Sequence, residues 1–366
     1  MTVLMTDQDL VAAPCLKEGP IALEASELVA ASRSFGSSPW QNVMRAWSVP
    51  CLFHNMERIF PSESDPVPAI RSSLTELTEF FKAASKESLG LLNRAADLAA
   101  GSGSPEDDVE RVTGEHYGRL FEAFADASFW DEPKKLLQHR LERNGVSLES
   151  IKGKTVLDAG CGGGRYTVAW RLLGAASAVG VDVSTTGLAD ARKRVAQARI
   201  DNVEFKEGNV LQLPFPDHAF DIVFSNGVLH HSVDWARGVH ELLRVMKPGG
   251  LGCLYLIENP GGLFWDLIEI LRLVTEPVSR DLARASLRLI GIPGNRIFYM
   301  LDHVMVPINL RLTDGEIQLC LSAAGARDLR RLTRGADFDR IEQIDLGHPY
   351  ARVKYGVGEH RYVFSK

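Results

Sequence analysis

Between residues 155 and 258 the chain alternates short apolar runs with longer stretches in which apolar and polar residues recur at helical spacing. The apolar runs cover residues 155–157, 179–183, 203–205, 220–224 and 251–258. Strands that alternate with helices in this way are typical of a mostly parallel sheet covered by helices. We therefore expect an α/β fold for this part of the chain.

The pattern that precedes these strands is helical, from residue 21 to about residue 144. A stripe that includes Leu74 and Phe81 has the spacing of an amphipathic helix, which packs either into a core or at an interface. At 366 residues the chain is long for one domain. We expect residues 1–150 to form an N-terminal helical extension, acting as a lid or a dimerisation surface, and residues 151–366 to form the α/β domain.

Residues 259–312 interrupt the alternation of strands and helices. Two apolar helical stretches, 263–274 and 282–290, precede a piece rich in Met and Pro at 300–307. This segment follows the carboxyl end of a strand, where α/β sheets build substrate pockets. We expect a helical cap over the site of the substrate, followed by a helix that begins near Thr313 and two last strands.

The richest chemical signal is the glycine loop after the first expected strand. That strand ends at Asp158, and Gly160, Gly162 and Gly164 follow, with Arg165 opening a helix-compatible run. A strand, a tight glycine turn and a helix N-terminus form the place where open α/β sheets hold nucleotide-like ligands. Glycine lets the backbone approach a ligand closely. The alternative is a plain tight turn.

Polar residues also end the next three strands. Asp182, with Val183 beside it, follows the glycines by about 20 residues, where a carboxylate accepts the hydroxyls of a ribose. Asn209 and Val210 follow the third strand, and Asn226 ends the fourth. Each has a plainer reading, because Asp favours helix caps and Asn favours turns.

Two adjacent histidines, His230 and His231, follow the fourth strand. An unperturbed imidazole titrates near working pH, so at least one of them is a candidate general base. The alternative is that they only cap or pack this loop.

Taken together, these blocks resemble the class I S-adenosylmethionine-dependent methyltransferases, in particular the ubiquinone/menaquinone-type group of methyltransferase types 11 and 25. The resemblance rests on Val-Leu-Asp-Ala-Gly-Cys-Gly-x-Gly at 156–164, Leu-Pro-Phe at 213–215, Phe-Asp-x-Val at 220–223 and Leu-x-x-Val-x-Lys-Pro-Gly-Gly at 242–250. It covers residues 152–260 closely. It implies a Rossmann-like seven-stranded sheet, mostly parallel with the last strand antiparallel, that binds S-adenosylmethionine and releases S-adenosylhomocysteine.

The resemblance also assigns roles around the cofactor. The glycine loop takes the methionine and ribose portion and Asp158 orders that loop. Asp182 binds the ribose hydroxyls, and Asn226 lines the methionine side. Asn209 and Val210 are assigned to binding the adenine, and Arg165 to pairing with the cofactor carboxylate. Tyr117 is assigned to a lid over the cofactor. Asn209 departs from the family, which usually carries Asp there, but Asn keeps a carbonyl acceptor for the adenine amine.

The composition of the chain limits the classes of partner that it is expected to bind. A net charge of −6 and a pI near 6.0 give no basic footprint, so we expect no nucleic acid. No run reaches the roughly 18 apolar residues of a membrane span, and the first residues lack the pattern of a secretory signal. Five scattered cysteines without a Cys-x-x-Cys predict neither a metal site nor a disulfide framework, and fit a cytoplasmic location.

We therefore expect a methyltransferase that acts on a small-molecule acceptor through O, N or S. The arginines between residues 272 and 340 favour an acidic acceptor, although solvated surface positions explain them as well. One variant is S-methylation of a carboxylated thioether, which gives a sulfonium product and needs no base. Other hypotheses are a non-catalytic cofactor-binding module and a macromolecular methyltransferase. A homodimer through the N-terminal helices is a further hypothesis.

Overall fold

The computed structural model describes the backbone of residues 13–95 and 129–366 and the side chains of residues 13–85 and 129–366. The described residues fall into two compact units. The first unit gathers residues 13–95, 262–306 and 348–355. The second gathers residues 129–261, 307–347 and 356–366. Each unit is described by itself.

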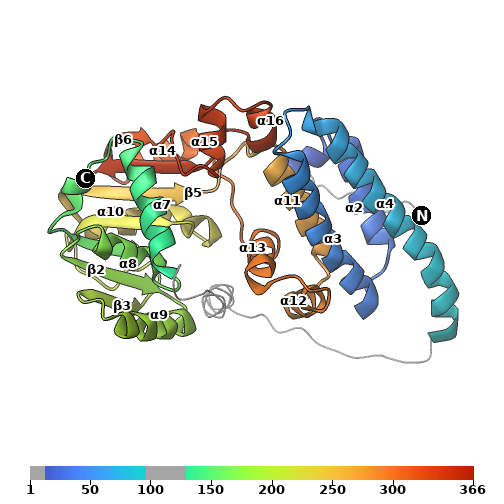
Figure 1. Cartoon of the computed structure of the whole chain (residues 1–366), viewed down its shortest axis with the longest axis horizontal. Coiled ribbons are helices and arrows are strands. Elements are labelled where there is room, and N and C mark those ends of the chain that lie inside the picture. Colours follow the sequence, from blue (N-terminus) through green and yellow to red (C-terminus); the bar gives the residue numbers. More distant parts are fainter. Residues whose placement is uncertain (1–12, 96–128) are drawn as a thin grey trace. The chain divides into compact units, whose positions relative to one another are not determined.

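A seven-stranded sheet forms the centre of the second unit, in the order β3-β2-β1-β4-β5-β7-β6 (Figure 1). The strands are β1 (Thr155–Ala159), β2 (Ser177–Asp182), β3 (Val203–Glu207), β4 (Phe220–Asn226), β5 (Met246–Leu256), β6 (Arg327–Arg331) and β7 (His360–Ser365). Neighbours from β3 to β5 pair in parallel, whereas β7 runs antiparallel to both β5 and β6. The expected Rossmann-like sheet with an antiparallel last strand is confirmed.

Alternating residues of the strands pack against two helical layers. On one face, Val156, Ile222 and Phe224 pack with the helices that precede and follow β1. On the other face, Leu157 and Val223 pack with the helices on either side of β5 and β6. The first layer holds α7 (Asp131–Glu142), α8 (Arg165–Leu172) and α9 (Thr185–Ala198); the second holds α10 (Trp235–Val245) and α14 (Asp314–Ala323). Because successive side chains of a strand point to opposite faces of the sheet, each strand contributes apolar residues to both hydrophobic cores.

Local sequence explains where several of these helices begin. The Ser184 and Asp234 side chains accept backbone N–H groups at the starts of α9 and α10. Thr313 and Glu316 form a capping box at the start of α14, as the Thr-x-x-Glu sequence predicts. Short helices that the sequence pattern did not predict lie between β6 and β7, namely α15 (Arg340–Asp345) and α16 (Ala351–Tyr355), of which α16 belongs to the first unit.

The first unit is helical. It contains α2 (Ala22–Ser34), α3 (Pro39–Ile59), α4 (Pro66–Ala95), α11 (Gly262–Thr275), α12 (Arg280–Leu289) and α13 (Gly294–Val304), with α16 (Figure 1). In α4, Leu74 and Phe81 are fully buried, and the Phe81 ring meets Phe35 edge to face. Helices α11, α12 and α13 all pack on α3, so the inserted segment forms one unit with the N-terminal helices. Their role as lid, cap or dimerisation surface stays a prediction.

Within the described ranges, no helix combines the length and the apolar character that crossing a membrane requires.

His360 on β7 is fully buried, and within the described residues neither of its ring nitrogens has a hydrogen-bond partner. Burial, reinforced by the charge of Arg331, lowers the pKa of His360 to about 4, although Asp314 and the nearby backbone of Asn259 and Leu312, which makes no well-formed hydrogen bond to the ring, oppose this in part. Because the unfolded imidazole titrates near 6.5, the neutral ring stabilises the fold fully above that pH. This contribution is lost as the pH falls from 6.5 toward 4.

We therefore expect the free energy of unfolding of His360→Leu to equal that of the wild type at pH 7.5. On acidification this free energy should fall less in the variant than in the wild type, by roughly 3 kcal/mol at pH 4. Urea unfolding at pH 7.5, 5.5 and 4.5 measures this difference. The exposed His348 supplies a matched control, His348→Leu, which should follow the wild type. Parallel pH curves for His360→Leu and the wild type would contradict the expectation.

Candidate cofactor and acceptor site

The glycine loop between β1 and α8 is held in left-handed backbone conformations. Gly160, Gly162 and Gly164 have φ values of +82°, +53° and +73°, which L side chains rarely adopt. A Cβ at Gly160 would collide with Val228, and one at Gly164 would collide with the ring of Phe205. The glycines are therefore required by the protein's own packing as well as by any ligand.

Asp158 ends β1 beneath this loop. Its Oδ2 accepts a hydrogen bond from the Thr167 hydroxyl of α8 at 2.6 Å. Burial raises the pKa of Asp158 to about 7, the nearby Asp182 adds to the rise, and the Thr167 hydrogen bond opposes it. Asp158 thus ties the strand end to the first turns of α8. Thr167 was not predicted as a site residue, and only its position on the inner face of α8 marks it in the sequence.

Asp182 ends β2 and clamps two backbone segments. One oxygen accepts the N–H of Gly162 and the other accepts the N–H of Ser184, both at 2.8 Å. Burial raises the pKa of Asp182, although the backbone donors at Ser184 and Gly162 lower it in part. Each oxygen keeps a second lone pair, so the carboxylate has acceptor capacity beyond these two bonds. Val183, beside it, is exposed.

Asn209 organises the turn after β3. Its side-chain oxygen accepts the N–H of Leu211 at 2.8 Å, an Asx turn of the kind that asparagine favours. Val210 is buried in the core on the α10 face of the sheet. Asn209 therefore stabilises a turn in the structure, as the alternative interpretation of the sequence predicts. The side-chain carbonyl of Asn209 has a second lone pair.

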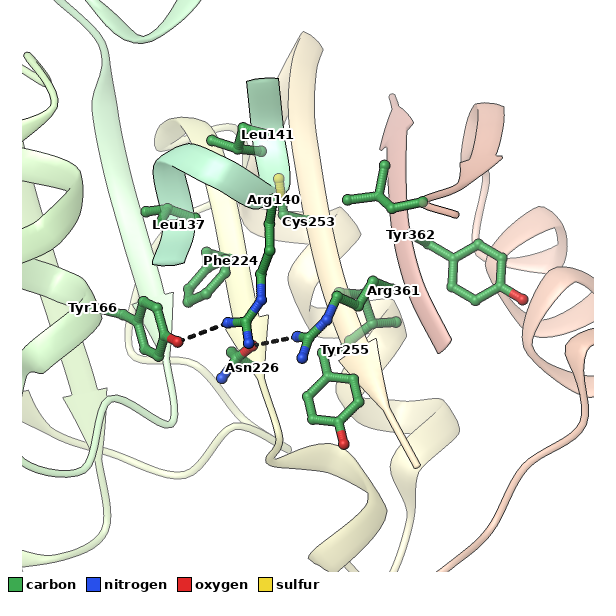
Figure 2. A pocket seen from close by; sticks show the side chains of 12 residues that line it. Leu137, Arg140, Leu141, Tyr166, Phe224, Asn226, Cys253, Tyr255, Arg361 and Tyr362 are labelled. Carbon is green, nitrogen blue, oxygen red and sulfur yellow. Dashed lines mark hydrogen bonds between the residues drawn. The ribbon is translucent and has the colours of Figure 1, made fainter. Parts of the chain in front are cut away.

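Asn226 ends β4 beside a small cavity (Figure 2). The cavity has a volume of about 30 Å³ and lies between α7 and the ends of β4, β5 and β7. Arg361 of β7 donates from Nη1 to the Asn226 side-chain oxygen at 3.2 Å, and its guanidinium stacks 4.2 Å from the ring centroid of Tyr255. Arg140 of α7 lies on the other side and donates to the Tyr166 hydroxyl at 2.9 Å.

A buried ionic network supports this cavity. Arg140 forms a bidentate pair with Asp339, with both N···O distances at 2.7 Å. Although burial opposes the charged form, Tyr166 and Asp339 raise the pKa of Arg140 above its usual range. Burial would raise the pKa of Asp339, but Arg140 and Arg361 hold it well below its usual range. The pair stays charged at every working pH. Neither Arg140 nor Arg361 was predicted as a site residue.

The two histidines lie in different hydrogen-bonding environments. Nδ1 of the buried His230 accepts the N–H of Ile257 at 3.3 Å, so the neutral ring carries its proton on Nε2. Nδ1 of the half-buried His231 lies 2.7 Å from the Ile308 carbonyl, to which only a protonated Nδ1 can donate. In the neutral His231 ring the lone pair is therefore on Nε2. The rings meet at 4.2 Å between centroids.

The segment 307–312 runs beside the histidine loop. Leu310 N–H donates to the His230 carbonyl at 2.9 Å, and Leu312 N–H donates to the Ile257 carbonyl at 3.0 Å. Between these anchors, both polar atoms of the Asn309 amide are buried and have no partner among the described residues. This buried amide follows Ile308, whose carbonyl contacts His231, and no sequence signal indicated it.

Other predicted residues have different surroundings. Arg165 forms an ion pair with Glu132 and donates to the Phe129 carbonyl at 3.2 Å, so its guanidinium already has protein partners. Tyr117 lies outside the described residues. Several arginines of the C-terminal third likewise form ion pairs with carboxylates of the chain itself. They include Arg296 with Glu57, Arg334 with Glu342 and Arg340 with Glu258. Their number alone therefore does not indicate an acidic acceptor.

The donor set at the carboxyl ends of the strands fits S-adenosylmethionine. A carboxylate at the end of β2 is complementary to ribose hydroxyls, and a turn amide after β3 is complementary to an adenine amine. A glycine loop with left-handed conformations lies between them, and a guanidinium lies beside the end of β4. Fold and site together are those of a nucleotide-type cofactor enzyme with a seven-stranded sheet.

The comparisons agree with this class. A family model described as a methyltransferase domain matches residues 157–254. The chain is 29% identical over 206 residues to 27-O-demethylrifamycin SV methyltransferase of Amycolatopsis mediterranei, covering 50% of this chain and 76% of that protein. It is 37% identical over 110 residues to demethylmenaquinone methyltransferase of Listeria monocytogenes, covering 28% of this chain and 45% of that protein. It thus spans about half the length of the latter relative.

Among solved structures, a SAM-dependent methyltransferase from Aquifex aeolicus aligns with a TM-score of 0.40 at 19% identity, covering 68% of this chain and 98% of that one. These matches identify residues 157–254 as a methyltransferase domain and support the resemblance to the class I S-adenosylmethionine-dependent methyltransferases, with S-adenosylmethionine as the cofactor.

The glycine loop offers a test of its packing. Gly249 has the same φ as Gly164, +73°, but a Cβ there would meet nothing within 4 Å. We expect Gly249→Ala to cost about 1–2 kcal/mol of unfolding free energy, because only the backbone is strained. Gly164→Ala should cost a further 1–3 kcal/mol, because its Cβ also overlaps Phe205.

Urea unfolding of the two variants measures the difference. The double variant Gly164→Ala/Phe205→Leu should recover part of the additional loss. Equal losses for the two single substitutions would contradict the collision with Phe205.

Proposed function

We propose that the chain transfers a methyl group from S-adenosylmethionine to an oxygen or nitrogen of a small-molecule acceptor, with His231 as the general base. The observation that carries this proposal is the 2.7 Å contact between His231 Nδ1 and the Ile308 carbonyl. That bond fixes the ring orientation and leaves Nε2 as the basic atom in the neutral form. A general base has a role only if the nucleophile loses a proton during the transfer. A hydroxyl or an amine loses one and a thioether does not, so an oriented base favours an oxygen or nitrogen acceptor.

The names of the relatives support a small-molecule acceptor. One relative is named for a demethylated rifamycin and another for demethylmenaquinone. The helical insert after β5 is consistent with an enclosed acceptor, although its placement over the site is part of the proposal.

The cofactor supplies a methyl group on a sulfonium, which an in-line nucleophile displaces. We assign Asp182 to the ribose hydroxyls, Asn209 and Val210 to the adenine, and the 160–164 loop to the methionine and ribose portion. Asp158 acts through Thr167 to fix this loop. Holding the nucleophile about 3 to 3.5 Å from the methyl carbon is the main task of the site.

On the acceptor side, His231 removes the proton and His230 fixes the loop that carries it. His230 does so with Nδ1 accepting from Ile257 and its carbonyl accepting from Leu310. The Asn309 amide, next to the residue that orients His231, is a polar contact for the acceptor. Tyr117 and the homodimer through the N-terminal helices remain predictions.

An acceptor screen tests the function. S-adenosylhomocysteine formation is measured against panels of phenols and other hydroxyl compounds, amines, carboxylates and thioethers. We expect turnover with a hydroxyl or amine compound. Turnover restricted to thioethers would exclude a proton-removing base, and the absence of turnover with every panel would favour a non-catalytic cofactor-binding module.

With a turned-over acceptor, His231→Asn should lower kcat by about 10²- to 10⁴-fold, because the amide can donate to Ile308 but cannot take a proton. The acid limb of the kcat/KM profile should disappear in this variant. His230→Asn is the comparison: it should lower the melting temperature and leave the shape of the pH profile intact. An unchanged kcat and pH profile in His231→Asn would overturn the base assignment.

Asp182→Asn tests the cofactor assignment. An amide can accept only through its oxygen, so one of the N–H groups of Gly162 and Ser184 would face a donor. We expect S-adenosylhomocysteine affinity to fall at least 10-fold, measured by calorimetry. Asp190→Asn, on the neighbouring helix α9, is the control and should bind normally. Wild-type affinity in Asp182→Asn would remove Asp182 from the ribose site.

A further inference from the structure

The turn between α12 and α13 of the first unit, residues 289–293, exposes a run of apolar side chains. Leu289 is 87% exposed and Ile290 is 47% exposed. Pro293 is exposed as well, and Ile292 is half-buried. Isolated apolar residues are common on protein surfaces, whereas an exposed run of them usually serves a contact. We refer to residues 289–293 as the apolar turn.

The backbone donors of the apolar turn are already bonded inside the protein. The N–H groups of residues 290, 291 and 292 donate to carbonyls in the last turn of α12, at 3.0 to 3.3 Å, and Pro293 has no N–H. The φ of +82° at Gly291 is the left-handed conformation that closes a helix end in this way. An unbonded N–H group is costly to remove from water. Because these donors are satisfied, the turn can enter an apolar environment without leaving one of them unpaired.

Arginine side chains without an ion pair flank the apolar turn. Arg284 and Arg288 lie one helical turn apart on α12, and the second of them directly precedes the apolar turn. In the part of the chain that the structure describes, neither side chain forms an ion pair or a hydrogen bond. The helix α12 contains three arginines and one acidic residue, Asp281. The charge beside the apolar turn is therefore positive, although the whole chain carries a net charge of −6.

We propose that the apolar turn inserts into the surface of a membrane that contains anionic lipids, with Arg284 and Arg288 contacting the lipid headgroups. Removing the leucine and isoleucine side chains from water is favourable. Guanidinium groups bind phosphate through paired N–H groups. Apolar side chains next to basic ones are the combination by which proteins lie at an anionic membrane surface.

The extent and the charge of this surface favour a lipid over a protein partner. A stable interface between proteins buries about 800 Å² on each partner. Leu289 and Ile290 are the strongly exposed large apolar side chains of the turn, and they supply only part of such an area. In a symmetric pair of chains the same surface would meet itself, which would bring Arg284 and Arg288 of both copies together. A bilayer needs no matching surface, and its phosphates are complementary to the arginines.

Co-sedimentation of the full chain with lipid vesicles tests the proposal. We expect the wild type to bind vesicles of phosphatidylcholine and phosphatidylglycerol more tightly than vesicles of phosphatidylcholine alone. High salt, which screens exposed charges, should remove this preference. Leu289→Gln should weaken binding to the mixed vesicles by about 10-fold or more. The double variant Arg284→Gln/Arg288→Gln should weaken it by about 30-fold, the effect of two charges at an anionic surface.

Matched controls come from the second unit. Leu319 on α14 is 73% exposed and Arg327 on β6 is exposed, so Leu319→Gln and Arg327→Gln should bind the vesicles like the wild type. An unchanged urea midpoint in Leu289→Gln would show that its loss of binding is not a loss of folding.

Two results would overturn the proposal. One is a wild type that binds neither kind of vesicle, or binds both equally. The other is a Leu289→Gln variant that binds the mixed vesicles as tightly as the wild type. Sedimentation velocity without vesicles covers the protein alternative: self-association of the wild type that Leu289→Gln abolishes, without any vesicle binding, would assign the turn to a second copy of the chain. Because these measurements need neither cofactor nor acceptor, they are independent of the proposed reaction.

Discussion

The bidentate pair between Arg140 and Asp339 is the interaction on which the open end of the sheet depends. It joins α7, which precedes β1 in the chain, to the loop that follows β6, across 199 positions of sequence. Both charges are buried, so neither partner tolerates loss of the other. Arg361 lies 3.7 Å from the same carboxylate and donates from Nη1 to Asn226.

A second buried pair extends this arrangement along β5. Arg340 donates to Glu258 at 2.8 Å, and Glu359 accepts the backbone N–H groups of Arg340 and Ile341. Glu258 stands just before the chain leaves the second unit at residue 261, and Glu359 stands just after it returns at residue 356. The charges therefore fix the sheet end where the inserted helices begin. A well-packed apolar core would stabilise these positions as well, but it would not give Arg361 a polar neighbourhood.

The sequence predicted those elements that are encoded by local patterns of residues. The five parallel strands, the capped helix after Thr313 and the glycine loop follow from apolar periodicity, capping residues and turn chemistry. The helix α13 was not predicted, although Ile297, Met300, Leu301 and Val304 give it an apolar stripe at helical spacing. The helices α15 and α16 are too short to show periodicity. Motif resemblance, rather than periodicity, predicted the antiparallel β7.

The rest of the site depends on distant contacts that no local pattern carries. The arginines at 272–340 are numerous, yet several of them form ion pairs with carboxylates of the chain itself. No local pattern marks Arg361 in the last strand, and only the structure shows that it donates to Asn226 and lies beside the Arg140–Asp339 pair.

The same holds for the histidines. Adjacent in sequence, they differ because Ile257 donates to one ring and Ile308 accepts from the other. The tautomer of the neutral His231 ring is decided by a backbone carbonyl 77 positions away. A carbonyl at that place requires the segment 307–312 to lie along the end of β5, where Leu312 bonds Ile257 and Asn259. The return of the chain from the inserted helices thus sets the tautomer of the neutral His231 ring.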